Sequence, residues 1–412
     1  MELIGRKVLI ASIIVSLAIG FGGGFLFAHK EGNGAVTAAL ENLINQDLGK
    51  PNDVDFSLFW QVWTTLRDRY VDQGKLNTRA MVYGAIQGMV GAVGDPYTTF
   101  FEPVESKKFE EDIAGAFSGV GMEIGKRDGA LVVISPLKDS PAMKAGLKAG
   151  DRILRINEES TEGISVEEAV KQIRGPKGTR VTLTINSGTD SEAREVTIVR
   201  DVIKVAAATW KMLDGDIAYI ELTTFSQNLD REFENIVKEI TQSKAKKIIV
   251  DLRNNPGGLL DSSVTTAGWF LSRNSLVTIQ EFGDKTRREY RTDGNAALRE
   301  YPTAFMINGG SASASEILAG AVHDNRGITL VGEKSFGKGS VQELEKFSDG
   351  SSLKVTIAKW LTPNGVSISE TGIEADVKIA IDPEAFKKGE IIIGEPGKDP
   401  QLDRAIKIVN NP

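Results

Sequence analysis

Strands and helices alternate from Ile217 onward, and this alternation limits the fold more than any other feature of the 412-residue chain. Short apolar runs typical of strands are separated by stretches whose apolar residues recur at helical spacing. The predicted strands are 217–220, 247–251 and 303–307, and the predicted helices are 229–240, 261–271 and 313–322. Such alternation indicates α/β units on a partly parallel sheet. The residues from 341 to 381 return to strands, with turns at Asp349-Gly350 and Pro363-Asn364-Gly365.

Two further segments precede this predicted core. Residues 105–200 have the size of one small domain and are rich in strand and turn signals. The expected elements there are strands at 119–124, 131–134, 181–185 and 195–199 and a helix at 166–173. Residues 56–94 carry apolar positions at helical spacing. That helical segment would bury little alone, so we expect it to pack on a neighbour or on a second subunit.

The amino-terminal residues predict a membrane anchor. Val8 to Phe27 is a run of twenty residues without a charge, preceded by Arg6 and Lys7. Twenty helical residues span roughly 30 Å, about the hydrocarbon thickness of a bilayer. The flanking cations predict a cytoplasmic amino terminus and an extracytoplasmic location, periplasmic or at the cell surface, for the bulk of the chain. A cleaved signal peptide is the alternative.

Composition excludes several classes of chemistry. The chain has no cysteine, which excludes a cysteine nucleophile, a thiolate metal site and a disulfide framework. Its only histidines are His29 and His323, so a histidine-rich zinc site is not expected. We expect neither a metal nor a cofactor. The formal charge of −7 argues against a nucleic-acid partner.

A serine-rich run joins the predicted strand 303–307 to the helix that follows. It reads Asn308-Gly309-Gly310-Ser311-Ala312-Ser313-Ala314-Ser315-Glu316-Ile317. A serine at a helix amino terminus has unpaired N–H groups beside it, which would stabilise an oxyanion. The alternative is purely structural, because Ser313 and Glu316 fit a helix capping box.

A second run, from Gly332 to Gln342, contains a lysine flanked by glycines. Gly332 to Lys338 nearly fits a phosphate-binding loop, but Gly339 lacks the required hydroxyl and the next residues alternate like a strand. Ser335 and Lys338 match the SxxK spacing of penicillin-binding enzymes, although their KTG and SDN partners are absent. Taken alone, such a lysine is most often a solvated turn residue.

The third run, Asp251-Leu252-Arg253-Asn254-Asn255-Pro256-Gly257-Gly258, directly follows a predicted strand. It fits an ordinary Pro-Gly turn. It also fits a loop that presents a backbone N–H beside a nucleophile.

These three runs, in this order and after a segment at 105–200 that resembles a PDZ domain, resemble the carboxyl-terminal processing peptidases. This is a family of tail-recognising serine proteases of the S41 type, and the resemblance covers nearly everything from residue 56 onward. It implies that Ser313 is the nucleophile, Lys338 the general base and Gln342 the residue that orients the base.

The resemblance also implies further site residues. The oxyanion hole would be formed by the backbone N–H groups of Ala314 and of Gly257 or Gly258, with Gly257 favoured. The carboxylate-binding loop of the PDZ domain would comprise Gly119, Val120, Gly121 and Met122, and Arg174 would link that domain to the protease core.

A lysine base must be neutral, so the pKa of Lys338 has to fall from its ordinary value by burial. Gln342 could accept one ammonium hydrogen without adding a negative charge. His323 follows Ser313 by ten residues, roughly 15 Å along a helix, and is not expected to reach the hydroxyl.

The expected fold is therefore α/β plus α+β and multidomain. Its parts are a signal anchor (1–29), a tether (30–52), a helical dimerisation region (53–104), a PDZ domain (105–200), a Ser-Lys protease core (201–382) and a helical tail (383–412). The expected partners are the C-terminal tails of protein substrates, the membrane and a second copy of the chain. Two alternatives are a PDZ adaptor with an inactive hydrolase domain and a cell-wall Ser–Lys acyltransferase.

Overall fold

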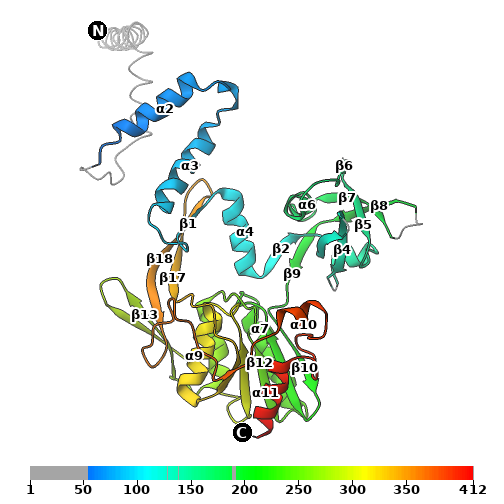
Figure 1. Ribbon diagram of the computed structural model, residues 1–412, viewed down its shortest axis with the longest axis vertical. Coiled ribbons are helices and arrows are strands. Elements are labelled where there is room, and N and C mark those ends of the chain that lie inside the picture. Colours follow the sequence, from blue (N-terminus) through cyan, green and yellow to red (C-terminus); the bar gives the residue numbers. More distant parts are fainter. Residues whose placement is uncertain (1–53, 128, 138, 188–191, 412) are drawn as a thin grey trace, which may run out of the picture. The chain divides into compact units, whose positions relative to one another are not determined.

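The computed structural model describes residues 54–127, 129–137, 139–187 and 192–411 (Figure 1). The predicted anchor 1–29 and tether 30–52 lie outside the described residues. Within these ranges, no helix combines the length and the apolar character needed to cross a bilayer. The chain divides into two compact units, residues 1–81 and 82–412.

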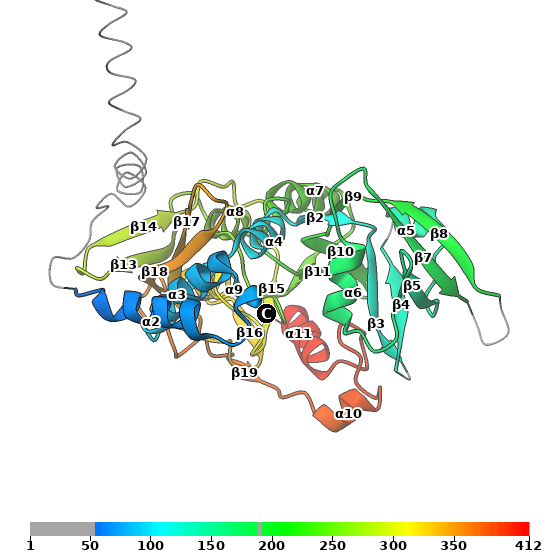
Figure 2. The same ribbon diagram turned by 90° about the horizontal axis from the view of Figure 1, so that it is seen from above.

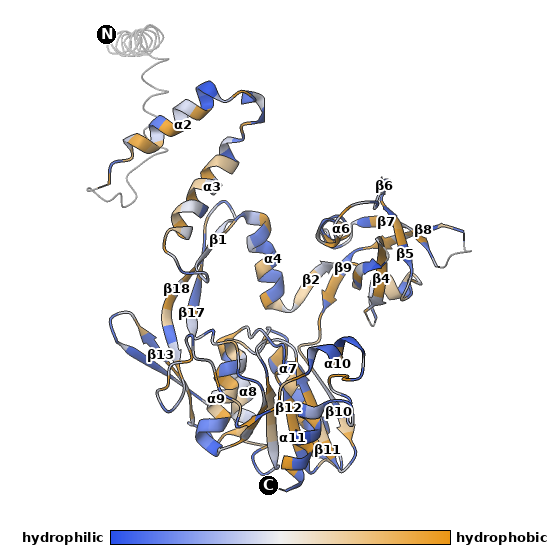
Figure 3. Cartoon of the chain, in the orientation of Figure 1, coloured by the Kyte–Doolittle hydropathy of each residue, from blue (hydrophilic) through white to orange (hydrophobic). Residues whose placement is uncertain are grey.

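The described part of the first unit is helical, as the apolar spacing predicts. It contains α2 (Ser57–Arg69), a 3₁₀ turn (Gln73–Lys75) and the first turn of α3 (Thr78–Gly91), which continues into the second unit. No residue of α2 is buried, and Figure 3 shows hydrophobic residues at intervals along this helix. The rings of Phe59 and Trp60 pack edge to face with centroids 5.0 Å apart.

The predicted α/β alternation is confirmed by a central six-stranded sheet. Its order is β10 (Ala208–Leu213), β11 (Ile217–Leu222), β12 (Lys247–Asp251), β15 (Thr303–Ile307), β16 (Thr329–Gly332) and β19 (Val377–Lys378). The β10–β11 pair is antiparallel and the remaining pairs are parallel. This is the mixed sheet expected when crossover helices connect successive strands.

Helices cover both faces of this sheet. On one face, α7 (Leu229–Gln242), α8 (Leu260–Phe270) and α9 (Ala314–Arg326) enclose the main core, to which Ile248 and Val250 contribute. On the other face, α11 (Pro400–Asn410) packs against a smaller cluster that contains Ile249. Figure 2 shows α7 and α8 on one side of the strands and α11 on the other. The short α10 (Pro383–Lys387) precedes α11 in the expected helical tail.

A second, antiparallel sheet adjoins the central α/β core. β17 (Ser340–Lys346) and β1 (Thr99–Phe101) both pair with the long β18 (Ser352–Leu361), which also pairs with β13 (Leu276–Phe282), and β14 (Arg287–Arg291) completes the sheet. The turn predicted at Asp349-Gly350 joins β17 to β18. The sequence did not predict β1, nor the helix α4 (Pro103–Ala114) that follows it.

The segment predicted to resemble a PDZ domain has its own hydrophobic core. Its sheet runs β3 (Met122–Arg127), β4 (Ala130–Pro136), β5 (Arg152–Ile156), β7 (Arg180–Asn186) and β8 (Arg194–Val199), with β6 (Glu159–Ser160) on β5. Two helices complete it, α5 (Pro141–Lys144) and α6 (Val166–Ile173), the second with the predicted bounds. The chain enters through β2 (Ala116–Gly119) and leaves through β9 (Asp201–Lys204), and these two strands pair.

Candidate active site

Ser313 stands at a sharp turn between β15 and α9. Its backbone has φ 55° and ψ −115°, a left-handed conformation that is costly for any residue other than glycine. Its side chain is half-buried. In α/β-hydrolases, a strained serine between a strand and the first turn of a helix exposes its nucleophilic hydroxyl in this way.

The loop after β12 is joined to the serine loop by reciprocal hydrogen bonds. Because β12 and β15 are parallel neighbours, their carboxyl ends meet at one edge of the sheet. There the Asn254 N–H donates to Asn308 Oδ1 (2.8 Å) and Asn308 Nδ2 donates to Asn254 Oδ1 (2.9 Å). The Ala312 N–H donates to the Asn255 carbonyl (3.0 Å). Each loop therefore fixes the position of the other.

Gly257 lies directly against the serine. A Cβ added at Gly257 would lie 2.5 Å from the Ala312 carbonyl oxygen and 2.8 Å from Ser313 Cβ, and the φ of Gly257 is +93°. Only glycine fits here without displacing Ser313. The Gly257 N–H donates to Asn255 Oδ1 (2.9 Å).

Two backbone donors beside Ser313 are unoccupied. Within the described ranges, neither Gly258 nor Ala314, the first residue of α9, donates its N–H in a hydrogen bond. The favoured oxyanion pair, Ala314 with Gly257, stays a prediction. In this structure the alternative glycine, Gly258, is the one whose N–H is unoccupied.

Lys338 lies in the loop between β16 and β17, and its side chain is half-buried. Its ammonium nitrogen stands 5.5 Å from the centroid of the Tyr97 ring. Burial lowers the pKa of Lys338, the positive charge of Lys354 lowers it further, and the Glu316 carboxylate acts in the opposite direction. A lowered pKa is the property that a lysine base requires.

Glu316 connects the serine loop to the lysine loop. Its Oε2 accepts the N–H groups of Ser313 (2.8 Å) and Lys338 (3.0 Å), and its Oε1 accepts the Ser335 hydroxyl (2.6 Å) and the Gly337 N–H (2.6 Å). Its side chain is fully buried, and burial raises the pKa of the carboxyl group while these four hydrogen bonds oppose the rise. The predicted capping box is present, and the same carboxylate also holds the lysine loop.

Gln342 follows on β17 and faces the same cleft. Its Nε2 donates to Ser340 Oγ (2.7 Å) and Thr356 Oγ1 (3.3 Å), which leaves Oε1 to accept a hydrogen. In the described part of the chain, no hydrogen bond joins Lys338 Nζ to Ser313 or to Gln342. The three side chains nevertheless line one cavity.

That cavity has a volume of about 730 Å³. One wall comes from α4, through Phe109, Asp112 and Ile113. Apolar side chains, among them Leu260 and Trp360, line another part of it. A mostly apolar cleft of this size, with a few converging polar groups, is suited to a bound ligand or substrate segment.

A second groove lies in the PDZ-like segment, between β3 and α6, with a volume of about 230 Å³. Val120, Gly121 and Met122 line it, and the first two donate no backbone hydrogen bond within the described residues. A Cβ at Gly121, whose φ is +73°, would meet Ser140 Cβ at 2.5 Å. The neighbouring Gly119 ends β2 and is buried.

Arg174 also borders this groove, at the end of α6. Its guanidinium carbon lies 4.3 Å from the centroid of the Phe117 ring. The predicted role of Arg174 as a link to the protease core stays a prediction.

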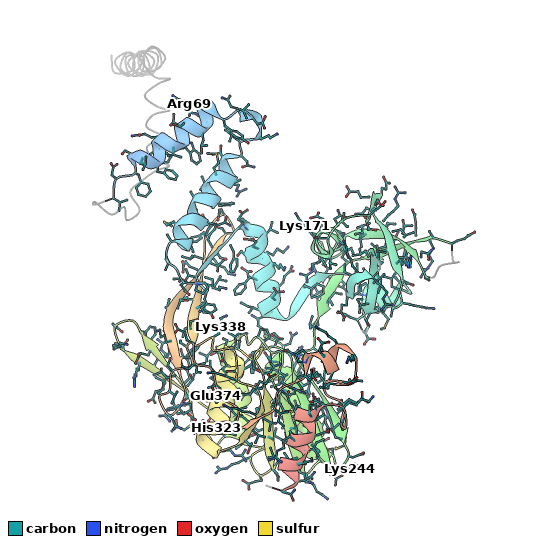
Figure 4. All side chains as sticks on the ribbon, in the orientation of Figure 1. Arg69, Lys171, Lys244, His323, Lys338 and Glu374 are labelled. Carbon is teal, nitrogen blue, oxygen red and sulfur yellow. The ribbon has the colours of Figure 1, made fainter. Side chains whose placement is uncertain are left out.

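His323 takes no part in the cleft, in agreement with the sequence. Its Nε2 lies 3.1 Å from Asp376 Oδ1 and its Nδ1 lies 3.4 Å from Asp324 Oδ1. Figure 4 shows His323 well apart from Lys338.

The sequence did not indicate two neighbours of the lysine, Tyr97 and Lys354. Both come from segments distant in sequence, and Lys354 reaches the cleft because β18 pairs with β17. No local motif marks either residue.

Two segments of the chain match known protein families. Residues 216–379 match peptidase family S41, and residues 110–186 match the PDZ domain. The carboxy-terminal processing protease CtpA of Bacillus subtilis is 34% identical over 337 residues, which cover 82% of this chain and 72% of the relative. CtpB of the same organism is 33% identical, over 94% of this chain and 81% of the relative.

A solved structure from Bacteroides fragilis, assigned to the S41 proteases, has the same fold. It aligns with a TM-score of 0.54 at 14% identity and covers 85% of this chain and 97% of that one.

Proposed function

The chain belongs to the carboxy-terminal processing proteases of peptidase family S41, serine-type enzymes with a PDZ domain, and from this premise we propose that Ser313 and Lys338 form its catalytic dyad. The observation that carries the proposal is the backbone of Ser313. Ser313 holds a strained left-handed conformation and lines the same cleft as Lys338, which supports the proposal.

The reaction would proceed through an acyl-enzyme. Ser313 Oγ attacks the carbonyl carbon of the scissile peptide bond while neutral Lys338 accepts the hydroxyl proton. Lys338 then gives that proton to the leaving amine as the C–N bond breaks. Water, deprotonated by the same lysine, attacks the ester; the C–Oγ bond breaks, Lys338 returns the proton to Ser313 Oγ, and the new carboxyl terminus is released. Gln342 Oε1 would accept a hydrogen from Lys338 and so aim the amine.

The negative charge on the tetrahedral oxygen would be stabilised by two backbone donors. The Ala314 N–H lies at the positive end of the α9 dipole, where an anion is favoured. The second donor comes from Gly257 or Gly258, whose loop contacts Ser313. Such donors act only as charge develops, so they lower the barrier rather than bind substrate.

The PDZ domain suggests binding of peptide C-termini. We propose that an extended tail adds to β3, and that its carboxylate is held by the amides around Val120 and Gly121. The apolar lining of the groove, which includes Ile124, favours an apolar final residue. Recruitment of the tail would precede cleavage at Ser313.

Replacement of the dyad tests the catalytic assignment. Ser313→Ala and Lys338→Ala should each lower cleavage of an unfolded protein substrate by roughly 10³-fold or more, because residues that act as one unit fail together. His323→Ala is the control, because its partners are Asp376 and Asp324. A fully active Lys338→Ala enzyme, or loss of activity in His323→Ala, would refute the dyad.

We also propose that the enzyme works outside the cytoplasm, anchored by residues 8–27, which lie outside the described residues. Protease treatment of sealed cells tests this: protection of the catalytic part would contradict it.

The unburied aromatic side chains of α2 support a homodimer. Sedimentation of Trp60→Glu, which should shift a dimer to monomer, checks that proposal.

A further inference from the structure

A buried arginine lies at the start of the loop that contacts the nucleophile. All five N–H donors of Arg253 have acceptors, and its side chain is only 2% exposed. Nε and Nη2 donate to Asp251 (2.9 and 2.6 Å), Nη1 and Nη2 to Asp399 (3.1 and 2.8 Å), and Nη1 also to Gln401 (2.8 Å). Two of these three partners come from the C-terminal helical tail.

The side chain of Asp399 is 0% exposed, and it both caps a helix and pairs with Arg253. Its carboxylate caps α11 by accepting the N–H groups of Gln401 and Leu402, both at 3.1 Å, and it accepts the Gly394 N–H at 2.8 Å. The same two oxygens also accept hydrogen bonds from the guanidinium of Arg253. Burial opposes ionisation, but the hydrogen bonds and charge of Arg253 prevail, and the pKa of Asp399 is lowered.

Charge balance does not require Asp399. Asp251 already neutralises Arg253, and Tyr219 donates its hydroxyl to Asp251 Oδ2 at 2.6 Å. A second buried carboxylate leaves the cluster with one excess negative charge, and a buried ionic group adds little net stability. What Asp399 does add is a second carboxylate, bound through Nη1 and Nη2, that fixes the guanidinium in place.

Arg253 is linked to the serine loop through its neighbours in the chain. The adjacent Leu252 carbonyl accepts the Ser311 hydroxyl at 2.8 Å, and the Arg253 N–H donates to Asp251 Oδ1 at 2.9 Å. Farther along the same loop, Gly257 lies so close to Ser313 that even a methyl group would not fit. A small shift of the loop must therefore move either the oxyanion donor or the serine.

We propose that Asp399 is a positioning residue of the peptidase reaction, which holds the oxyanion loop in register with Ser313 through Arg253. The inference rests on the proposed function. It makes the C-terminal tail, which touches no reacting atom, a part of the catalytic apparatus. A misplacement of this loop by a fraction of an ångström would weaken the transition state more than substrate binding.

The test is Asp399→Asn in the full chain. Asparagine still caps a helix, so α11 remains. Its side chain, however, has one acceptor oxygen in place of the two of aspartate. We expect kcat to fall about 10- to 100-fold with KM nearly unchanged. A peptide aldehyde, which forms a hemiacetal with Ser313 and places its oxygen in the oxyanion hole, should lose affinity by about tenfold or more. The matching peptide alcohol should not.

Two control variants separate positioning from stability. Asp382→Asn makes the same change at the exposed N-cap of α10, where the side chain accepts only the Glu384 N–H among the described residues, and should leave kcat unchanged. Val409→Ala removes packing of α11 from the sheet without touching Arg253, so it should lower stability and preserve the aldehyde affinity.

The inference is overturned if Asp399→Asn keeps wild-type kcat, if aldehyde and alcohol weaken equally, or if Val409→Ala loses as much aldehyde affinity. Continued cleavage by Ser313→Ala would instead overturn the proposed function, so the two failures are distinguishable.

Discussion

Ser313 and Lys338 donate their backbone N–H groups to the same oxygen atom, Oε2 of Glu316, over 2.8 and 3.0 Å. The two residues are 25 positions apart, yet one fully buried carboxylate determines where both backbones lie. Geometry between a nucleophile and its base decides the rate of proton transfer. In the proposed Ser313–Lys338 mechanism, Glu316 would therefore act on catalysis without facing the substrate.

Glu316→Gln should damage stability and activity together. A glutamine has one acceptor oxygen in place of two, so at least one of the four donors around residue 316 would face an amide NH₂ group. We expect a loss of about 2 kcal/mol or more in the free energy of unfolding and a drop in kcat of at least tenfold. Denaturant unfolding and steady-state kinetics measure both.

The control for this prediction is Glu345→Gln, at an exposed position of β17. Glu345→Gln should change neither the free energy of unfolding nor kcat. Unaltered kcat in Glu316→Gln would show that the shared carboxylate does not position the dyad.

The pH profile follows from the environment of Lys338. Its pKa is lowered by burial and by Lys354, so kcat/KM should rise with a single ionisation centred below the ordinary lysine pKa of 10.5. Lys354→Met removes the neighbouring positive charge, and the pKa of Lys338 should then rise. The ascending limb should move to higher pH, and activity at neutral pH should fall. Rate measurements across pH 5 to 10, roughly the range where the limb lies, decide it.

Lys354→Arg keeps the charge and should leave the limb in place. Two carboxylates act here in opposite directions: Glu316 raises the pKa of Lys338, whereas Asp95 raises the pKa of Lys354 and so preserves the positive charge that lowers the pKa of Lys338. A limb that does not move in Lys354→Met would remove Lys354 from this role.

Local patterns predicted the regular core well. The bounds of β12, β15 and α6 agree with the predicted ranges, because short buried apolar runs and a strong amphipathic repeat are local signals. β14 was missed, because Arg287–Arg291 is mostly charged and exposed and becomes a strand only by pairing with β13. β1 depends in the same way on β18.

For the candidate site too, the sequence predicted some residues and missed others. The sequence identified Ser313 and Lys338 through motifs and a family resemblance, and it recognised the capping box of Glu316. It could not predict that Glu316 also holds Ser335 and Lys338, nor that Asp399 reaches Arg253 across 146 residues. Such contacts are set by tertiary packing, which leaves no spacing rule in a single sequence.

Gly257→Ala tests the oxyanion loop. The new methyl group would meet the Ala312 carbonyl at 2.5 Å in a backbone conformation that disfavours alanine, so the loop must move away from Ser313. We expect kcat to fall by about 100-fold or more, as when an oxyanion donor is lost. Gly365→Ala is the matched control, because its φ of +80° imposes similar strain with no atom within 4 Å. Equal activity of the two variants would contradict the assignment.

The last prediction concerns the groove between β3 and α6. Val120 and Gly121 have backbone N–H groups that donate no hydrogen bond in the described residues, which is the state expected of a carboxylate-binding loop. Gly121 is required there, since a Cβ would meet Ser140 at 2.5 Å and its φ is +73°. The same residues could serve only to pack a small domain.

A substrate with a free, apolar carboxyl terminus should therefore be cleaved with a higher kcat/KM than the same peptide with an amidated end. Because a hydrogen bond to a charged group contributes roughly 1.5–3 kcal/mol, the ratio should be about tenfold or more. Gly121→Ala should reduce that ratio towards one. Gly163→Ala, also in this domain, with φ +80° and open space, should preserve it. Equal kcat/KM for the free and amidated peptides in the unmodified enzyme would leave the groove without a part in selecting tails.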